Sequence, residues 1–320
     1  MAIQGLALAA FILAAKATTV VSAASLVTFI FGDSLTEVGN NNYLQYSLAR
    51  SDFPWYGIDY SGGKATGRFT NGRTIVFSFY FLWNLKLKNW GFHHHHPYLS
   101  LSKNDDALLK GVNYASGGAG ILNDTGLYFI QRLSFDDQID CFKKTKESIT
   151  TKIGAEAANK LCNEAMYFIG IGSNDYVNNY LQPFLADGQE YTPEEFVKLV
   201  STTLDNQLTR LYQLGAQKGG LPWSWSTWLH SITEDTYGDV LDLIDNPTAY
   251  GFKVSNTSCC NVDTNIGGLC LPNSKLCSNR TDYVFWDAFH PSDKANAILA
   301  EKFFSTLFSG PPSIAPKPSP

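Results

Sequence analysis

Two uninterrupted apolar runs constrain the fold of this chain more than any other feature of its sequence. LVTFIF (26–31) and AMYFIGIG (165–172) are rich in β-branched and aromatic residues, and a Gly follows or ends each run. Strands of a parallel sheet show such continuous apolar runs, because helices cover both of its faces. GVNYA (111–115) and YVFW (283–286) are weaker candidates for strands of the same sheet.

Helical patterns lie between and after these runs. In the stretch that begins at Tyr191, Thr192 is the expected N-cap, Pro193 takes the first helical position and Glu195 completes a capping box. The apolar spacing of this helix stops at Gly215, and a second helix is expected after Ser292. Strands that alternate with helices indicate an α/β fold, with its chemistry at the carboxyl ends of the strands.

Composition and termini favour a secreted globular domain. Hydrophobic residues make up 44% of the chain, so a sizeable core is expected. The net charge is −5, so we expect no positive electrostatic field that would attract nucleic acid. Residues 1–24 have the pattern of a signal peptide, although a buried N-terminal helix is the alternative. We expect one domain at 25–309, a disordered tail at 310–320 and no integral membrane segment after signal cleavage. The predicted location is extracellular, including the cell wall, and the oligomeric state stays open.

Cysteines and sequons agree with export. Asn123, Asn256 and Asn279 each begin an N-x-S/T glycosylation sequon. Six Cys, an even number, predict disulfides in an oxidising compartment, with open connectivity. They are Cys141, Cys162, Cys259, Cys260, Cys270 and Cys277. No metal site is expected, because CxxC pairs are absent and the run His93–His96 has no companion ligands.

Polar residues follow the predicted strands at the places where a parallel sheet carries chemistry. Ser34 lies in a tight turn directly after 26–31, where it suits either a nucleophile or an N-cap. Gly117 and Gly118 permit close approach of the backbone to a ligand, or form an ordinary turn. Asn174 follows 165–172 and offers an amide donor, or caps a turn.

A carboxylate and an imidazole stand close together near the C-terminus. Asp287 and His290 are three residues apart, just before the second expected helix. A carboxylate on one ring nitrogen of a His leaves the other nitrogen basic and oriented. A capping Asp and a surface His are the alternative. Taken with Ser34, the pair supplies a nucleophile, a base and an orienting acid.

Phe31–Leu35, FGDSL, resembles the signature of the plant GDSL esterase/lipase family, a branch of the SGNH hydrolases. Further blocks stand in family order, namely FTNGR (69–73), NYASGGAGILNDTG (113–126), IGSNDY (171–176), NPTAYGF (246–252) and WDAFHP (286–291). The resemblance implies a flavodoxin-like α/β/α three-layer fold and hydrolysis of carboxylic esters of lipid or acylated substrates, without a cofactor.

The resemblance also implies roles for single residues. Ser34 would be the nucleophile, His290 the base and Asp287 its partner. Oxyanion donors would be the Ser34 N–H, an N–H of Gly117 or Gly118, and the Asn174 side chain. Whether the acyl group is hydrolysed or transferred, and which acyl and alcohol groups are taken, stays open.

Two tracts depart from the family pattern, at about 75–97 and 219–235. GGLPWSWSTWLHS (219–231) can be encoded so that a reading frame one base later gives VVFHGLGPLGCIP, the strand and motif that the family has there. The four-His tract can likewise be encoded so that a reading frame two bases later gives a Pro-rich run, KLGFPSPPP. We hypothesise that both tracts are out-of-frame readings and that a stretch after 231 is missing, so we expect an incomplete central sheet.

Two other function classes remain. One is a catalytically impaired or non-enzymatic secreted glycoprotein with a disrupted scaffold. The other is a carbohydrate-binding module that uses the three Trp of the tract, for which saccharide binding should be lost in Trp225→Ala. Ester hydrolysis that depends on Ser34 would favour the enzyme over both.

Overall fold

Two fully buried strands, β2 (Thr28–Gly32) and β5 (Met166–Ile171), form the middle of the sheet. They run parallel and in register from Thr28 opposite Met166 to Gly32 opposite Gly170. The structure is a computed structural model, and it describes residues 10–13, 27–87, 95–216, 233–262 and 268–309. Both long apolar runs of the sequence are therefore confirmed as central parallel strands.

The sheet has the strand order β3-β4-β2-β5-β1-β6. β3 (His96–Pro97), β4 (Gly111–Asn113), β2 and β5 are mutually parallel, whereas β1 (Ala10–Leu13) runs antiparallel to β5 and to β6 (Thr233–Glu234). The parallel part thus has four strands. Beyond β5, the next place in the sheet is taken by β1, a segment from the expected signal peptide.

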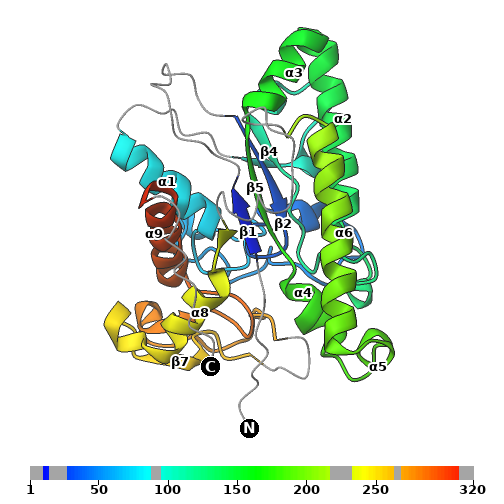
Figure 1. Cartoon of the computed structure of the whole chain (residues 1–320). Helices are drawn as coiled ribbons and strands as arrows, with labels where there is room; N and C mark the ends of the chain where they lie inside the picture. The colour runs from blue at the N-terminus through cyan, green and yellow to red at the C-terminus, as the bar shows by residue number, and fades with distance from the viewer. Residues whose placement is uncertain (1–9, 14–26, 88–94, 217–232, 263–267, 310–320) are drawn as a thin grey trace.

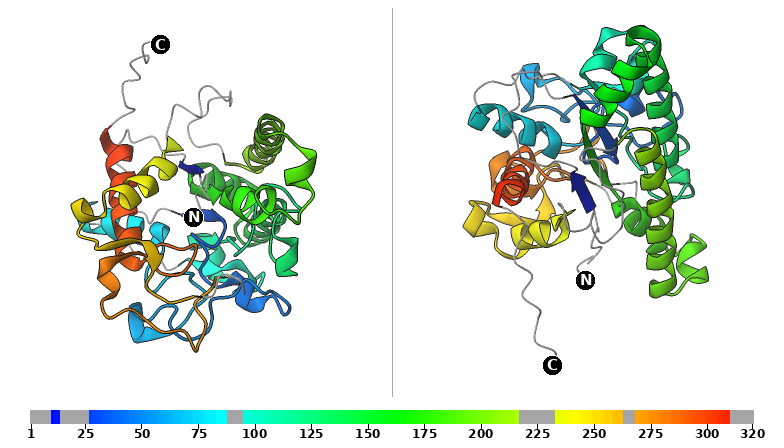
Figure 2. Two further views of the ribbon diagram at one scale, coloured as in Figure 1. Left: turned by 90° about the horizontal axis from the view of Figure 1, so that it is seen from below. Right: turned by 45° about the horizontal axis from the view of Figure 1, so that its top comes forward.

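Helices cover both faces of the sheet, which gives the expected three layers (Figure 1). One face carries α2 (Phe135–Ile153), α3 (Ala155–Glu164) and α6 (Pro193–Gln213), and the other carries α1 (Ile75–Leu87), α8 (Thr236–Asp245) and α9 (Asp293–Ser309). Figure 2 shows the same division from two further directions. The α/β/α fold is confirmed.

Local sequence signals explain where the long helices start. The Thr192 side chain accepts the Glu195 N–H, and the Glu195 carboxylate accepts the Thr192 N–H in return, as the capping box predicts. Ser134 and Asp137 form the same reciprocal pair at the start of α2. These two boxes fix the starts of the helices that cover one face of the sheet.

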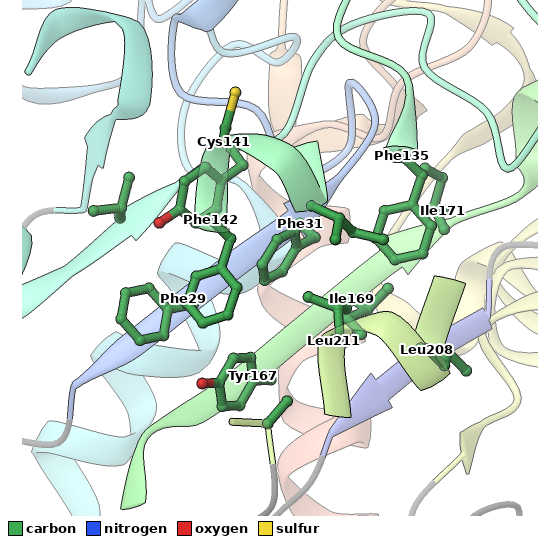
Figure 3. Packing of buried hydrophobic residues seen from close by; sticks show 14 of the residues in the cluster. Phe29, Phe31, Phe135, Cys141, Phe142, Tyr167, Ile169, Ile171, Leu208 and Leu211 are labelled. Carbon is green, nitrogen blue, oxygen red and sulfur yellow. The ribbon is translucent and has the colours of Figure 1, made fainter. Parts of the chain in front are cut away.

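Aromatic side chains make the core between the sheet and these helices. Phe29 and Phe31 of β2 lie against Phe142 of α2, with ring centroids 4.9 and 5.8 Å apart (Figure 3). On the opposite face of the sheet, Phe79 of α1 packs on Phe303 of α9 at 4.9 Å. The central strands are thus buried on both sides, which is why their sequences are continuously apolar.

Several short elements complete the chain. α4 (Ser173–Asp175), the π-helical turn η6 (Tyr176–Tyr180) and α5 (Asp187–Glu190) follow β5. The 3-10 turns are η1 (Asn40–Tyr43), η2 (Ser61–Gly63), η3 (Tyr98–Ser100), η4 (Asp106–Lys110), η5 (Leu127–Phe129), η7 (Pro247–Tyr250) and η9 (Arg280–Asp282).

One predicted strand lies elsewhere than expected. YVFW does contain a strand, β8 (Tyr283–Phe285), but it pairs with β7 (Val254–Ser258) in a separate two-stranded sheet and not with the central one. Only the middle residue of β8 is fully buried, so it lacks the double burial of a central strand. The length and apolar character of this segment do not by themselves distinguish a strand of the central sheet from a strand of a small separate sheet.

The disulfide prediction is confirmed for four cysteines and wrong for two. Cys259 pairs with Cys277, and Cys260 pairs with Cys270. Cys141 of α2 and Cys162 of α3 are buried free thiols, and burial raises the pKa of each to about 11. These two sit in the core beneath the helices as small apolar side chains, which is a common place for unpaired Cys.

Three predicted segments lie wholly or mostly outside the described residues. They are the Trp-rich tract, the tail at 310–320 and most of the leader, of which only 10–13 is described. Of the four-His tract, residues 75–87 form α1 and residues 88–94 lie outside the description. The domain bounds and the signal peptide therefore stay predictions.

Candidate active site

Ser34 and His290 meet although 256 residues separate them in the chain. The Ser34 Oγ lies 2.8 Å from the His290 Nε2. Ser34 follows β2 in the turn at its carboxyl end, and His290 lies in the loop that leads from β8 to α9. The imidazole is 4% exposed, while Ser34 is only half-buried, so the hydroxyl remains reachable from solvent.

Asp287 holds the imidazole from the other side. The His290 Nδ1 lies 2.8 Å from both carboxylate oxygens of Asp287, which is fully buried. Oδ1 also accepts the backbone N–H groups of Phe289 and His290, at 2.9 Å each. A carboxylate in this place favours the tautomer with the proton on Nδ1 and leaves Nε2 as acceptor for the Ser34 hydroxyl.

The turn that carries Ser34 is clamped to its neighbours. Gly32 has φ +151°, and a Cβ there would stand 2.3 Å from the Gly170 carbonyl oxygen of β5, so only Gly fits. The Asp33 Oδ1 accepts the Leu35 N–H at 2.9 Å, and Oδ2 accepts the Ser173 hydroxyl at 2.8 Å. The turn after β2, the first loop of the site, is thereby tied to the turn after β5, its third loop.

The second loop of the site is the Gly-rich segment after β4, and Glu37 connects it to the turn that carries Ser34. The Gly117 N–H donates to the Glu37 Oε2, and the Glu37 Oε1 accepts the Asn41 N–H at 2.7 Å. Among the described residues the Gly118 N–H has no hydrogen-bond partner, and its φ is +80°. A Cβ on Gly118 would stand 2.5 Å from the Phe129 ring, so the position requires Gly.

The third loop brings Asn174 to the same sheet edge. Its Nδ2 donates to the Ala119 carbonyl oxygen at 2.8 Å, and its Oδ1 accepts from the Asn178 amide. One of the two Nδ2 hydrogens is thus used within the protein. The neighbouring Asp175 accepts the N–H groups of Ile121 and Leu122, at 2.8 and 2.9 Å, which binds the third loop to the second.

The FTNGR block anchors the segment that follows His290. Asn71 accepts the Asp293 N–H at 2.8 Å, and the Arg73 side chain pairs with the Asp293 carboxylate through Nε at 2.9 Å and Nη2 at 2.6 Å. Phe69 of the same block lies against the His290 ring, with centroids 4.9 Å apart. The start of α9 and the imidazole are therefore held by one loop.

Burial perturbs the carboxylates beneath the site. Desolvation raises the pKa of Asp33 to about 6, although hydrogen bonds from Leu35 and Ser173 oppose the shift. Desolvation also raises the pKa of Glu37 well above its ordinary value. Perturbed carboxylates gather at functional sites, although buried structural networks produce them too.

Sequence reasoning missed the residues that support this constellation. Tyr56 donates its hydroxyl to the Asp287 Oδ2 at 2.7 Å, and Glu37 holds the Gly117 N–H. Neither belongs to a local pattern that points to chemistry. Only the position of Glu37 three residues after Ser34 signals that it turns back toward the site.

The three sequons are at the surface. Asn123, Asn256 and Asn279 are all exposed, and each carries its amide on a loop or on β7. Among the described residues, no group of three or more His, Cys, Asp or Glu side chains is arranged to hold a metal ion. In that same part of the chain, no helix has both the length and the apolar character needed to cross a membrane.

Comparison with known proteins identifies the family. The profile described as GDSL-like Lipase/Acylhydrolase matches residues 28–222 and 225–303. One GDSL esterase/lipase of Arabidopsis thaliana is 58% identical, with 99% of each chain aligned. Two others from Arabidopsis thaliana are 39% and 38% identical and align with 86% and 87% of this chain, and with 85% and 86% of their own.

The alignment with the first of these relatives is longer than the chain itself. It spans 361 positions against 320 residues, so at least 41 of its positions face gaps in this chain. The family profile also breaks at residues 223–224, inside the Trp-rich tract. The blocks around the site nevertheless lie within the matched ranges. The chain therefore belongs to the GDSL-like lipase/acylhydrolase family of carboxylic ester hydrolases.

Proposed function

We propose that this protein hydrolyses carboxylic esters with Ser34 as the nucleophile, His290 as general base and acid, and Asp287 as the group that orients His290. The observation that carries the proposal is the unbroken contact from Ser34 Oγ to His290 Nε2 and from His290 Nδ1 to Asp287, each at 2.8 Å. Such a chain needs no metal or cofactor to activate a hydroxyl.

The first half of the reaction acylates the enzyme. The Ser34 Oγ bonds to the ester carbonyl carbon while its proton passes to the His290 Nε2, and the carbonyl electron pair moves onto oxygen. When this tetrahedral intermediate collapses, the carbon–oxygen bond to the alcohol breaks and the alcohol takes the proton from Nε2. Asp287 stabilises the imidazolium in the interval without itself accepting the proton.

Water completes the cycle. His290 takes a proton from a water molecule, whose oxygen attacks the acyl carbon of the Ser34 ester. Collapse of the second intermediate releases the carboxylic acid and returns the proton to Ser34. The half-buried position of Ser34 is compatible with access of both the ester and the water.

Free donors in the segments after β2, β4 and β5 are the candidates for holding the oxyanion. We assign the Ser34 N–H and the Gly118 N–H, which have no partner among the described residues, together with the second hydrogen of the Asn174 amide. Glu37 holds the Gly117 N–H, which makes Gly118 the better candidate of the two. Removal of one such donor typically lowers kcat by about 10²–10³-fold.

The substrate class that suits the family is an ester of a lipid or another acylated molecule. We further propose that the protein is secreted and glycosylated. Two disulfides at 259–277 and 260–270, three exposed sequons and the leader at 1–24 support this, because disulfides persist in oxidising compartments.

Hydrolysis of p-nitrophenyl butyrate by the purified chain tests the proposed function. Wild-type protein should turn the ester over, and Ser34→Ala should reduce kcat by at least 10³-fold. Ser148→Ala is the matched control, because that hydroxyl is exposed on α2 and donates only to the Lys144 carbonyl oxygen. Equal rates for wild type and Ser34→Ala would favour the non-enzymatic glycoprotein instead.

A further inference from the structure

A buried tyrosine contacts a carboxylate oxygen of Asp287 that also lies against His290. The Tyr56 hydroxyl donates to the Asp287 Oδ2 at 2.7 Å and at the same time accepts the Cys270 N–H at 3.0 Å. Tyr56 is 1% exposed. The hydroxyl therefore has one donor and one acceptor, both fixed, and its proton points at Asp287.

The Cys260–Cys270 disulfide holds the far end of this arrangement. The two cysteines of the bridge stand ten positions apart in the sequence, and the Cys260 N–H donates in turn to the Trp286 carbonyl oxygen at 2.8 Å. Trp286 directly precedes Asp287. The Cys270 N–H that donates to Tyr56 is thus linked to the backbone before Asp287 by the disulfide and one hydrogen bond.

Aromatic packing fixes the Tyr56 ring. Its centroid lies 5.5 Å from that of Phe53 and 6.0 Å from that of Phe69, both edge to face. Phe69 also contacts the His290 ring. Trp55, directly before Tyr56, has φ +81°, a left-handed conformation that bulky residues rarely adopt and that clusters at functional sites.

We propose that Tyr56 is a positioning residue for the triad, which holds Asp287 through its hydroxyl and is itself held by the backbone N–H of Cys270, a member of the Cys260–Cys270 disulfide. This inference rests on the proposed function for its consequence in catalysis. With Tyr56 in place, the Asp287 Oδ2 accepts from a neutral donor, which holds the carboxylate in its orientation toward the His290 Nδ1. Burial and the nearby Asp287 charge raise the pKa of Tyr56 well above its ordinary value, so the phenol remains a donor.

The pH dependence of activity depends on the charged and titratable groups around the His290 imidazole. Asp287 contacts it directly, Asp33 of the turn after β2 acts on it through charge, and Tyr56 acts through Asp287. Loss of the Tyr56 hydroxyl leaves the buried carboxylate with one donor fewer. Its charge is then less stabilised, and His290 is held more strongly in the charged form. Both effects move the acidic limb of activity to higher pH.

Tyr56→Phe tests the inference, with Tyr167→Phe as the matched control. Tyr167 is also buried, and its hydroxyl donates to the Cys162 carbonyl oxygen at 2.9 Å, remote from the triad in the core beneath α2 and α3. Tyr56→Phe should lower kcat about tenfold with KM unchanged. It should also shift the acidic limb of the pH–activity profile to higher pH by roughly one unit. Both effects have the size expected for a hydrogen bond to a charged group. Tyr167→Phe should change neither.

Two further readouts separate this inference from the proposed function. In an Asp287→Asn background, Tyr56→Phe should have no further effect on kcat, because the two residues act through one interaction. An NMR titration of the His290 ring should show the upward pKa shift without any substrate. Turnover that depends on Ser34, with an unchanged profile in Tyr56→Phe, would overturn the inference alone. An unmoved His290 titration would overturn it whether or not an ester is hydrolysed.

Discussion

Replacement of Asp287 by Asn should remove most of the activity while it leaves the fold in place. The Asn amide oxygen can occupy the place of Oδ1, where it still accepts the backbone N–H groups of Phe289 and His290. The amide nitrogen then takes the place of Oδ2, 2.8 Å from His290 Nδ1. A donor in that place disfavours a proton on Nδ1 and so favours the tautomer with the proton on Nε2.

The size of the expected loss of activity follows from that tautomer. With a proton on Nε2, the imidazole cannot accept the Ser34 hydroxyl that stands 2.8 Å away, so general base catalysis is lost. The same change in a Ser-His-Asp protease lowers kcat by about 10⁴-fold, which corresponds to roughly 5.5 kcal/mol of transition-state stabilisation. We expect a similar loss here, with KM largely unchanged.

The assay is the hydrolysis of p-nitrophenyl butyrate by wild type and Asp287→Asn, together with thermal unfolding of both. The melting temperatures should agree within a few degrees, because the two backbone hydrogen bonds to Oδ1 survive. If Asp287→Asn keeps a kcat within tenfold of wild type, the carboxylate does not orient His290 and the proposed roles are wrong.

Three further predictions concern stability and the sequence itself. Because the pKa of Asp33 is raised to about 6 in the folded protein, its contribution to stability is fully present below its ordinary pKa of 3.8 and is lost as pH rises through 6. Relative to Asp33→Asn, wild type should lose about 2.4 kcal/mol of unfolding free energy between pH 4 and pH 7 in urea titrations, and the same pH dependence in both proteins would refute this. The double variant Cys260→Ala/Cys270→Ala should lose about 3 kcal/mol of unfolding free energy, because the unfolded chain regains the entropy that closure of a loop of about ten residues removes. A loss under 1 kcal/mol would contradict this entropic explanation. Sequencing of the source transcript across 75–97 and 216–238 should show another reading frame in both tracts, and in-frame translation of both in native protein would end the frame hypothesis.

The arrangement of the proposed catalytic residues was predictable because its members lie in local patterns. Ser34 follows a continuous apolar strand, and Asp287 and His290 stand three residues apart before a helix. The carboxyl ends of parallel strands meet at one edge, so the topology itself brings these segments together. Their distances of 2.8 Å are what such a placement requires.

Residues that act across long sequence separations escaped prediction. Tyr56 reaches Asp287 over 231 positions from a loop without any periodic pattern. An even cysteine count also says nothing about pairing, so the buried thiols of Cys141 and Cys162 were wrongly included among the disulfides. In both cases the deciding fact is a contact in space that no local spacing encodes.

The edge of the parallel sheet is the part that the sequence describes least. The family resemblance implies a strand where this chain reads GGLPWSWSTWLHS, and that tract lies outside the described residues. Beside β5 the structure instead places β1 from the leader, antiparallel from Ala10 opposite Ile171 to Leu13 opposite Phe168. An unpaired β5 edge would be costly, which gives a physical reason for an apolar segment to pair there. The gaps in the alignment agree with a missing stretch.

Labelling with a fluorophosphonate tests the central claim most directly, because this probe reacts covalently only with an activated serine hydroxyl. Treatment of the intact chain, followed by peptide mass spectrometry, should place a single adduct on Ser34, and His290→Ala should abolish it. Absence of the adduct from folded wild-type protein, or an adduct on Ser34 that persists undiminished in His290→Ala, would contradict the account.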